Sequence, residues 1–154
     1  MDRTFCMIKP DGVQRRLVGK IVQRFEEKGL RIAGIKIIRV TEDMAKNLYS
    51  VHKGKPFYDS LVKFITSSPV VAMCLEGAYT VEVVRNLLGA TFGNTAAPGT
   101  IRGDYGCSKG FNLIHASDSP DSVARELPIF FKPEELASWS HADHVWVYEE
   151  PERK

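Results

Sequence analysis

The segment RTFCMIKPDGVQRRLVGKIVQRFEEKGLRIAGIKIIRV, residues 3–40, decides the fold class. Its opening RTFCMIK is largely apolar and runs into a Pro-Asp-Gly turn, which predicts a short strand. From Val18 to Phe25 apolar residues recur at helical spacing, and Gly29 is suited to end that helix. Leu30–Val40 is rich in isoleucine with interspersed basic residues, as expected for a strand with one solvent-exposed face. The segment therefore predicts a strand–helix–strand unit.

The same alternation continues in the middle of the chain. Thr41 is suited to cap a helix whose first turn carries acidic residues, which the helix dipole favours. Pro56 is placed as a first-turn residue of a further helix, which Ser67-Ser68-Pro69 ends. The apolar run Val70–Leu75 predicts a third, buried strand.

The last third of the chain contains one unusual stretch. Thr80 is suited to cap a helix that Gly89 closes. Residues 90–111 then hold five glycines and a proline with almost no periodicity, and compact domains rarely keep so long a loop without using it. Residues 112–116 predict a short strand, and residues 119–126 a final amphipathic helix.

The predicted order is β-α-β-α(α)-β-α-β-α. Two halves of this kind fit an α+β, ferredoxin-like sandwich, in which helices pack against one face of a four-stranded, mainly antiparallel sheet. A small doubly wound parallel sheet is the alternative, and periodicity does not separate the two. With 154 residues, the chain is predicted to form a single domain over residues 1–154.

Composition excludes several classes of protein. A hydrophobic fraction of 44% and a charged fraction of 26% argue against a disordered, collagen-like or disulfide-scaffold chain. A net charge of +2 is too balanced to attract a polyanion by bulk electrostatics. The sequence has no apolar run long enough to cross a bilayer and no signal-peptide pattern at its start, so no membrane partner and a cytoplasmic location are predicted.

Familiar ligand-binding motifs are absent or incomplete. Six residues separate Gly12 from Gly19-Lys20 where a P-loop needs four, and Ile21 replaces the Ser or Thr that binds magnesium. His141 and His144 lack a third ligand nearby, which favours a solvated pair over a metal site. The three cysteines form no CxxC pair and are predicted to be free thiols, so structural zinc is not expected.

The segment Asn112-Leu-Ile-His115-Ala-Ser-Asp-Ser119 is the best candidate for chemistry. His115 ends the predicted strand just before a helix N-terminus, where backbone N–H groups favour an anion. A neutral imidazole is a competent nucleophile, and a carboxylate on its other nitrogen would fix the tautomer. From these residues alone, a histidine that only helps to cap the helix is an equal alternative.

Cations are placed to serve such a nucleophile. Lys9 ends the first predicted strand, Arg85 lies on the helix after the third strand, and Arg102 lies in the glycine-rich stretch. Each alone is compatible with a solvated surface charge. Together with Thr91, the three could neutralise a polyphosphate and stabilise an in-line transfer by electrostatics.

Three segments resemble the signatures of the nucleoside diphosphate kinase family. They are Phe5-Cys-Met-Ile-Lys9-Pro-Asp-Gly-Val13, Pro98-Gly-Thr-Ile-Arg102-Gly-Asp104 and Asn112-Leu-Ile-His115-Ala-Ser-Asp-Ser119. The resemblance covers the chain from Arg3 to Tyr148 and favours His115 as a nucleophile. It implies a ping-pong reaction, in which a magnesium–nucleoside triphosphate phosphorylates His115 and a different nucleoside diphosphate takes the phosphoryl group.

The resemblance also implies roles for residues around that histidine. Glu126 orients and polarises the imidazole, and Ser117 holds Glu126 in place. Lys9 and Tyr49 lie against the transferring phosphoryl group. The resemblance places the phosphorylation on the pros nitrogen of His115.

Further residues are implied to bind the nucleotide. Arg85, Thr91 and Arg102 contact the other phosphates, and Asn112, together with the lysine of the first signature, reaches the ribose and its 3′-hydroxyl. Phe57 stacks on the base, and because every base can stack, weak discrimination among bases follows. Mg²⁺ rides on the nucleotide phosphates, so no protein metal ligands are needed.

Two departures from the family pattern stand out. Lys109 occupies a position, across the base from Phe57, where the family usually has an apolar residue, although its aliphatic stem could still cover the base. Phe92-Gly93 replaces a common Asn-Pro in the loop that builds subunit contacts, and the resemblance implies a hexamer or, less often, a tetramer. The alternative function is a non-catalytic nucleotide- or nucleic-acid-binding module, although no aromatic cluster beside a basic stripe requires nucleic acid.

Overall fold

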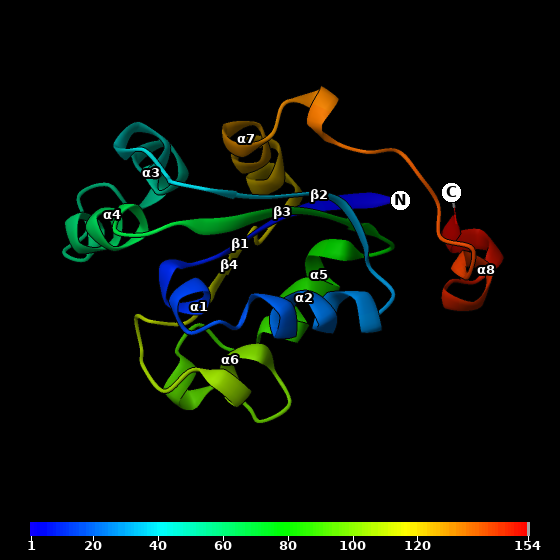
Figure 1. The fold of residues 1–154 in the computed structure, drawn as a ribbon, viewed down its shortest axis with the longest axis horizontal. Helices are drawn as coiled ribbons and strands as arrows, with labels where there is room; N and C mark the ends of the chain where they lie inside the picture. Colours follow the sequence, from blue (N-terminus) through cyan, green and yellow to red (C-terminus); the bar gives the residue numbers. More distant parts are fainter. Residues whose placement is uncertain (154) are drawn as a thin grey trace.

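Four antiparallel strands form one sheet in the computed structural model, which describes residues 1–153 (Figure 1). The spatial order is β2-β3-β1-β4. The strands are β1 (Asp2–Ile8), β2 (Arg31–Ile38), β3 (Val70–Gly77) and β4 (Ile114–Ala116). Since every pairing is antiparallel, the ferredoxin-like α+β prediction is confirmed and the parallel alternative is wrong.

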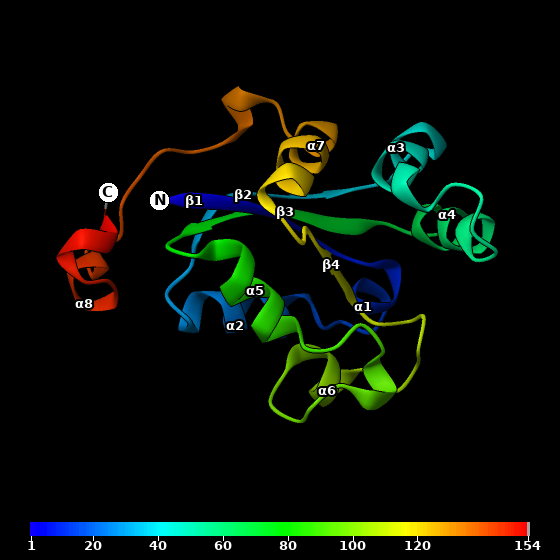
Figure 2. The ribbon, with the colours of Figure 1, turned by 180° about the vertical axis from the view of Figure 1, so that it is seen from behind.

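Helices cover the sheet on both sides (Figures 1 and 2). They are α1 (Pro10–Gln14), α2 (Val18–Glu27), α3 (Glu42–Leu48), α4 (Tyr58–Thr66), α5 (Thr80–Leu88), α6 (Ile101–Tyr105), α7 (Pro120–Phe130) and α8 (His144–Val147). Helices α2 and α5 lie on one face, and α3 and α7 lie on the other. Short 3₁₀ turns occupy Ser50–His52, Gly93–Thr95, Pro133–Glu135 and Glu150–Arg153.

The sequence predicted helices on only one face of the sheet, and strand β1 shows why both faces are covered. Side chains alternate across a strand, so Cys6 and Ile8 pack into the core with α2 and α5, whereas Phe5 and Met7 pack into the core with α3 and α7. Because both faces of β1 are apolar, each needs a layer of helices.

Two predicted helix starts need correction, and another is confirmed. Thr41 caps α3, since its hydroxyl accepts the Met44 N–H at 3.2 Å. Pro56 was expected in the first helical turn, but it lies in the preceding turn, and α4 begins at Tyr58. Thr80 is the first residue of α5 rather than its cap, because its hydroxyl donates to backbone carbonyl oxygens instead.

The glycine-rich stretch is more ordered than the sequence predicts. It contains α6, which begins where the Thr100 hydroxyl accepts the Gly103 N–H at 3.0 Å. The following strand is shorter than predicted and begins at Ile114. Helix α7, capped by Ser119, continues beyond Glu126 to Phe130. In residues 1–153, no helix combines the length and apolar character that a membrane crossing requires.

Candidate active site

A cavity of about 840 Å³ collects almost all of the predicted site residues. It lies where β4 leaves the sheet, between the α3–α4 region and the segment that contains α6. The predicted residues that line it are Lys9, Tyr49, Phe57, Arg85, Thr91, Arg102, Asn112, His115 and Glu126. Ser117 does not line the cavity, but its hydroxyl contacts Glu126 from behind.

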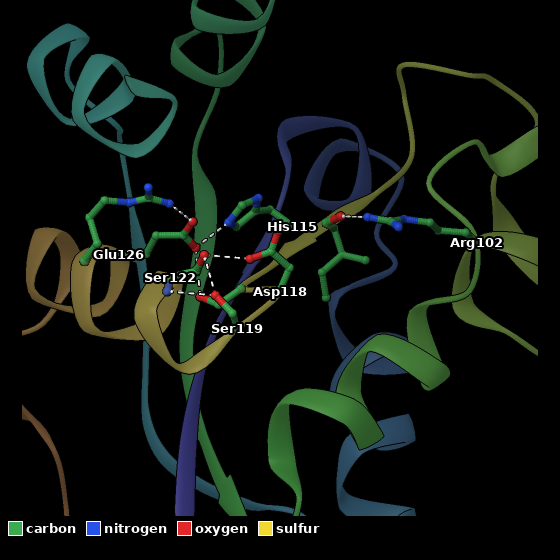
Figure 3. A network of polar contacts seen from close by, with 9 residues as sticks. Arg102, His115, Asp118, Ser119, Ser122 and Glu126 are labelled. Atoms are coloured by element: carbon green, nitrogen blue, oxygen red, sulfur yellow. Dashed lines mark hydrogen bonds and ion pairs between the residues drawn. The ribbon is translucent and has the colours of Figure 1, made fainter. Parts of the chain in front are cut away.

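Strand β4 and helix α7 together orient His115 (Figure 3). His115 pairs with Met7 across the sheet, and its Nε2 lies 2.8 Å from Oε2 of Glu126 on α7. A hydrogen bond from Nε2–H to this carboxylate selects one tautomer of the ring. Among the described residues, none bonds Nδ1, so the pros nitrogen keeps its lone pair. The geometry therefore supports the nucleophile over the helix-capping alternative.

Glu126 is buried and bonded on both carboxylate oxygens. Oε2 accepts from the Ser117 hydroxyl at 2.8 Å as well as from His115, and Oε1 accepts from Arg125 at 2.9 Å. Burial raises the pKa of Glu126, but the hydrogen bonds and charge of His115, with the bonds from Ser117 and Arg125, lower it further than burial raises it. Glu126 is thus held as the carboxylate that the histidine tautomer requires.

Lys9 is a buried cation at the end of β1. Its Nζ donates to Oδ1 of Asn112 at 2.8 Å, and the Asn112 amide donates to the Thr91 carbonyl at 2.7 Å. Burial, followed by the nearby charge of Arg102, lowers the pKa of Lys9 to about 8. Because this pKa is close to neutral pH, a bound anion such as a phosphate would stabilise the charged form of Lys9.

Arg102 is anchored to the backbone around the cavity and is only 3% exposed. Its guanidinium donates to four carbonyl oxygens, those of Gly89, Ala90, Asn112 and Ile114. Five N–H donors less these four bonds leave one donor for a ligand. Burial, then the charge of Arg85, lowers the pKa of Arg102 to about 10, so it stays charged at neutral pH.

Tyr49 brings a buried hydroxyl that no described residue satisfies. Its ring meets the His115 ring edge-on, with centroids 5.8 Å apart. Burial, then the charge of Glu126, raises the pKa of Tyr49, so its hydroxyl keeps its proton and can donate. A buried donor without a partner is costly, and a ligand oxygen in the cavity would relieve that cost.

Aromatic side chains form the other end of the cavity. Phe57 precedes α4 and is 48% exposed, as a stacking platform requires. The sequence did not single out Phe64 and Phe111, which also line this end, nor Arg125 beside Glu126. The helical spacing of Phe57 and Phe64 was a usable signal, because residues seven apart share one helix face.

No group of three His, Cys, Asp or Glu residues that could hold a metal ion is found in residues 1–153. His141 lies 3.7 Å from Asp143, and neither His141 nor His144 lines the cavity around His115. Cys6 and Cys74 are buried free thiols, and Cys107 is exposed. The cavity itself offers cations and hydrogen-bond donors, which suit a polyphosphate rather than a metal ion.

The family model and the sequence relatives that match this chain belong to one protein family. Residues 2–136 match the protein family described as nucleoside diphosphate kinase. Nucleoside diphosphate kinases from Archaeoglobus fulgidus and Thermoplasma volcanium are 53% and 55% identical, covering 97% and 94% of this chain and 99% of each relative.

Solved structures agree with the sequence relatives. A halophilic nucleoside diphosphate kinase from Halobacterium salinarum in complex with CDP superposes with a TM-score of 0.94 at 53% identity, covering 96% of this chain and 99% of that one. A nucleoside-diphosphate kinase from Borrelia burgdorferi, a transition state mimic with bound vanadate and ADP, has a TM-score of 0.89 at 40% identity, covering 94% of this chain and 95% of that one.

Proposed function

The chain belongs to the nucleoside diphosphate kinase family and is an enzyme of that class, and we propose that it works by a ping-pong transfer through His115. The free Nδ1 of His115, fixed by the bond from Nε2 to Glu126, is the observation that carries this proposal. In the first half-reaction Nδ1 attacks the γ-phosphorus of a nucleoside triphosphate. The bond from that phosphorus to the bridging oxygen breaks, and the diphosphate leaves with the electron pair.

The second half-reaction restores the histidine. A terminal phosphate oxygen of a different nucleoside diphosphate attacks the phosphorus, and the N–P bond breaks with its electrons returning to Nδ1. Glu126 and Ser117 keep the ring oriented throughout, because neither bond to the carboxylate involves the reacting nitrogen. A histidine with a carboxylate behind it is also a better nucleophile, since the developing positive charge on the ring is stabilised.

The cations and the tyrosine stabilise the charge that moves during transfer. Lys9 and Tyr49 act on the transferring phosphoryl oxygens, and Arg85, Thr91 and Arg102 bind the other phosphates. Phosphoryl transfer requires little covalent chemistry from the protein, so such electrostatic stabilisation supplies most of the catalysis. Mg²⁺ would be held by the nucleotide rather than by protein ligands and would neutralise phosphate charge, which fits a cavity that offers cations rather than a carboxylate cluster.

The nucleoside half of the substrate is held by groups that every nucleotide can use. Asn112 and Lys9 bind the ribose and its 3′-hydroxyl, and the half-exposed ring of Phe57 stacks on the base. Stacking tolerates any base, so weak base specificity follows. The relatives bound to CDP and to ADP support acceptors of both base sizes.

The decisive test is to isolate the phosphoenzyme. The pure protein is incubated with a magnesium–triphosphate donor without acceptor, quenched in alkali, and its intact mass is measured. We expect one acid-labile phosphoryl group, mapped to His115 and discharged by a different nucleoside diphosphate. Tight nucleotide binding without any adduct would instead favour a non-catalytic binding module.

We also propose a single domain, a homo-oligomer and a cytoplasmic location. Ile35 and Ile37 are exposed on the edge strand β2, which supports a subunit contact there. A hexamer is expected, and a tetramer is the alternative. Sedimentation equilibrium distinguishes the two, and a monomer would contradict both.

A further inference from the structure

The apolar end of the cavity contains an aromatic pair that the reaction scheme does not use. Phe57, just before α4, and Leu61 and Phe64 on α4 line the cavity. Phe111, from the segment before β4, lines it as well and is 57% exposed. So large an apolar ring, exposed within a cavity, is available for contact with a ligand.

Phe111 is held in place by stacking. Its ring lies on that of Phe64 with centroids 4.6 Å apart and planes 17° apart, which is a favourable parallel arrangement. The next residue, Asn112, is buried and bonded through its side chain to Lys9 and to the Thr91 carbonyl. Both the ring and its backbone are therefore anchored, and one side of the ring remains open.

Lys109 is less suited to cover a base. It lies two residues before Phe111, is exposed, and has a long flexible stem whose ordering costs conformational entropy. A stacked phenyl ring has already lost that freedom, because its neighbour fixes it. A preorganised aromatic ring nearby thus offers an apolar contact at a lower entropic cost than the flexible stem of Lys109, which also lines the cavity.

We propose that Phe111, positioned by Phe64, forms the second apolar wall of the base site and that this wall, together with Phe57, sets the affinity of this enzyme for the base. The assignment rests on the function proposed above. Phe57 supplies the first wall from the start of α4, and the Phe64–Phe111 pair supplies the second. Purines expose more ring surface than pyrimidines, so the second wall favours purine nucleotides.

The test compares KM values for a purine and a pyrimidine nucleoside diphosphate with the Ki of inorganic pyrophosphate, which has no base. Phe111→Ala is expected to raise the KM for the purine diphosphate about tenfold, within the range known for loss of one stacking contact. The effect on the pyrimidine should be smaller. The pyrophosphate Ki and kcat at saturation should not change.

Two double variants test the positioning role of Phe64. Phe64→Ala should raise KM nearly as much as Phe111→Ala, and combining the two should add little, because both remove the same wall. Phe57→Ala combined with Phe111→Ala should instead have nearly multiplicative effects. Trp146→Ala, which removes a ring that is 88% exposed outside the cavity, is the matched control.

Three outcomes would overturn the assignment. They are an unchanged KM in Phe111→Ala, an equal rise in the pyrophosphate Ki, or a KM effect in Lys109→Ala that exceeds the effect in Phe111→Ala. Failure of the proposed function itself is distinguished by the phosphoenzyme: wild-type protein that never becomes phosphorylated on His115 contradicts the mechanism, whatever Phe111 does. Sedimentation of each variant verifies that the assembly is unchanged.

Discussion

The two ends of the cavity are built differently. At the phosphate end, defined by Lys9, Arg102, Asn112 and Glu126, each side chain is buried and hydrogen-bonded to protein. At the base end, Phe57 and Phe111 are about half exposed; both rings contact other rings, and the Lys55 ammonium lies over that of Phe57. Fixed dipoles and charges stabilise a transition state without reorganising, whereas an open apolar surface accepts rings of different shape. The contrast predicts that changes at the phosphate end act on kcat and changes at the base end act on KM.

The largest effect is expected from His115→Ala. Without the nucleophile, transfer should fall by a factor on the order of 10⁴ or more, because no other group offers a covalent route. The fold should persist, since Ser117 and Arg125 still bond the Glu126 carboxylate. Steady-state kinetics and thermal unfolding together check this. Appreciable activity, or a collapsed fold, would contradict the role given to His115.

Lys9 should impose an alkaline limit on the reaction. Its pKa is lowered to about 8, so the ammonium is charged below that pH and neutral above it. The kcat/KM of the wild-type enzyme should therefore fall as pH rises through about 8. Lys9→Met should lower kcat by about 10²-fold, comparable to losing one group that stabilises developing charge.

Lys9→Arg provides the control for that pH dependence. A guanidinium stays protonated, so the alkaline decrease should move to higher pH even if the absolute rate falls. An unchanged pH profile in this variant would assign the ionisation to another group. The decrease at alkaline pH should also be smaller in kcat than in kcat/KM, because bound phosphate stabilises the charged lysine.

Phe57→Ala tests the base end. We expect KM to rise by the equivalent of about 1–3 kcal/mol, with kcat at saturation nearly constant. Phe57→Tyr keeps the ring and should behave like wild type. A proportional loss of kcat in Phe57→Ala would show that the two ends of the cavity are not independent.

The smallest effect is expected from Arg125→Gln. Arg125 donates to Oε1 of Glu126 from a partly exposed position, and such ion pairs contribute about 0–1 kcal/mol. Since this bond helps to lower the pKa of Glu126, its loss should raise that pKa and move the acid decrease of kcat/KM to higher pH. Arg125→Lys should restore the wild-type profile. The pH dependence of phosphoenzyme formation measures this.

The sequence predicted the strands well and the helix starts less well. Strands β1 and β3 contain the apolar runs Phe5–Ile8 and Val70–Leu75, and this signal needs no information about neighbouring strands. Pro56 and Thr80 were assigned by residue preference alone, but in the structure one lies in a turn and the other donates to the carbonyls of Asp2 and Gly77. Helix α6 was not predicted, because glycines interrupt its apolar periodicity, although its capping residue Thr100 is a recognisable helix-start signal.

The predicted site residues came from local sequence patterns and from the family resemblance, and the structure brings nearly all of them to one cavity. Of the residues that the sequence missed, Phe64 had only its helical spacing from Phe57 as a signal, and Arg125 and Phe111 had none. Arg125 matters only because it reaches Glu126, and Phe111 only because it meets Phe64, 47 positions earlier in the chain. The Arg125–Glu126 bond joins chain neighbours, but its importance depends on the distant contact between Glu126 and His115, and the Phe64–Phe111 contact is neither periodic nor local.

By itself the sequence determined the order of elements, the family signatures and which histidine is proposed as the nucleophile, because local periodicity and short spacings encode them. Tertiary structure alone decided that both sheet faces are covered, that Nδ1 of His115 is the free nitrogen, and that Arg102 is tied to four carbonyl groups. Those features depend on contacts between segments distant in the chain, which only close packing of the folded protein establishes.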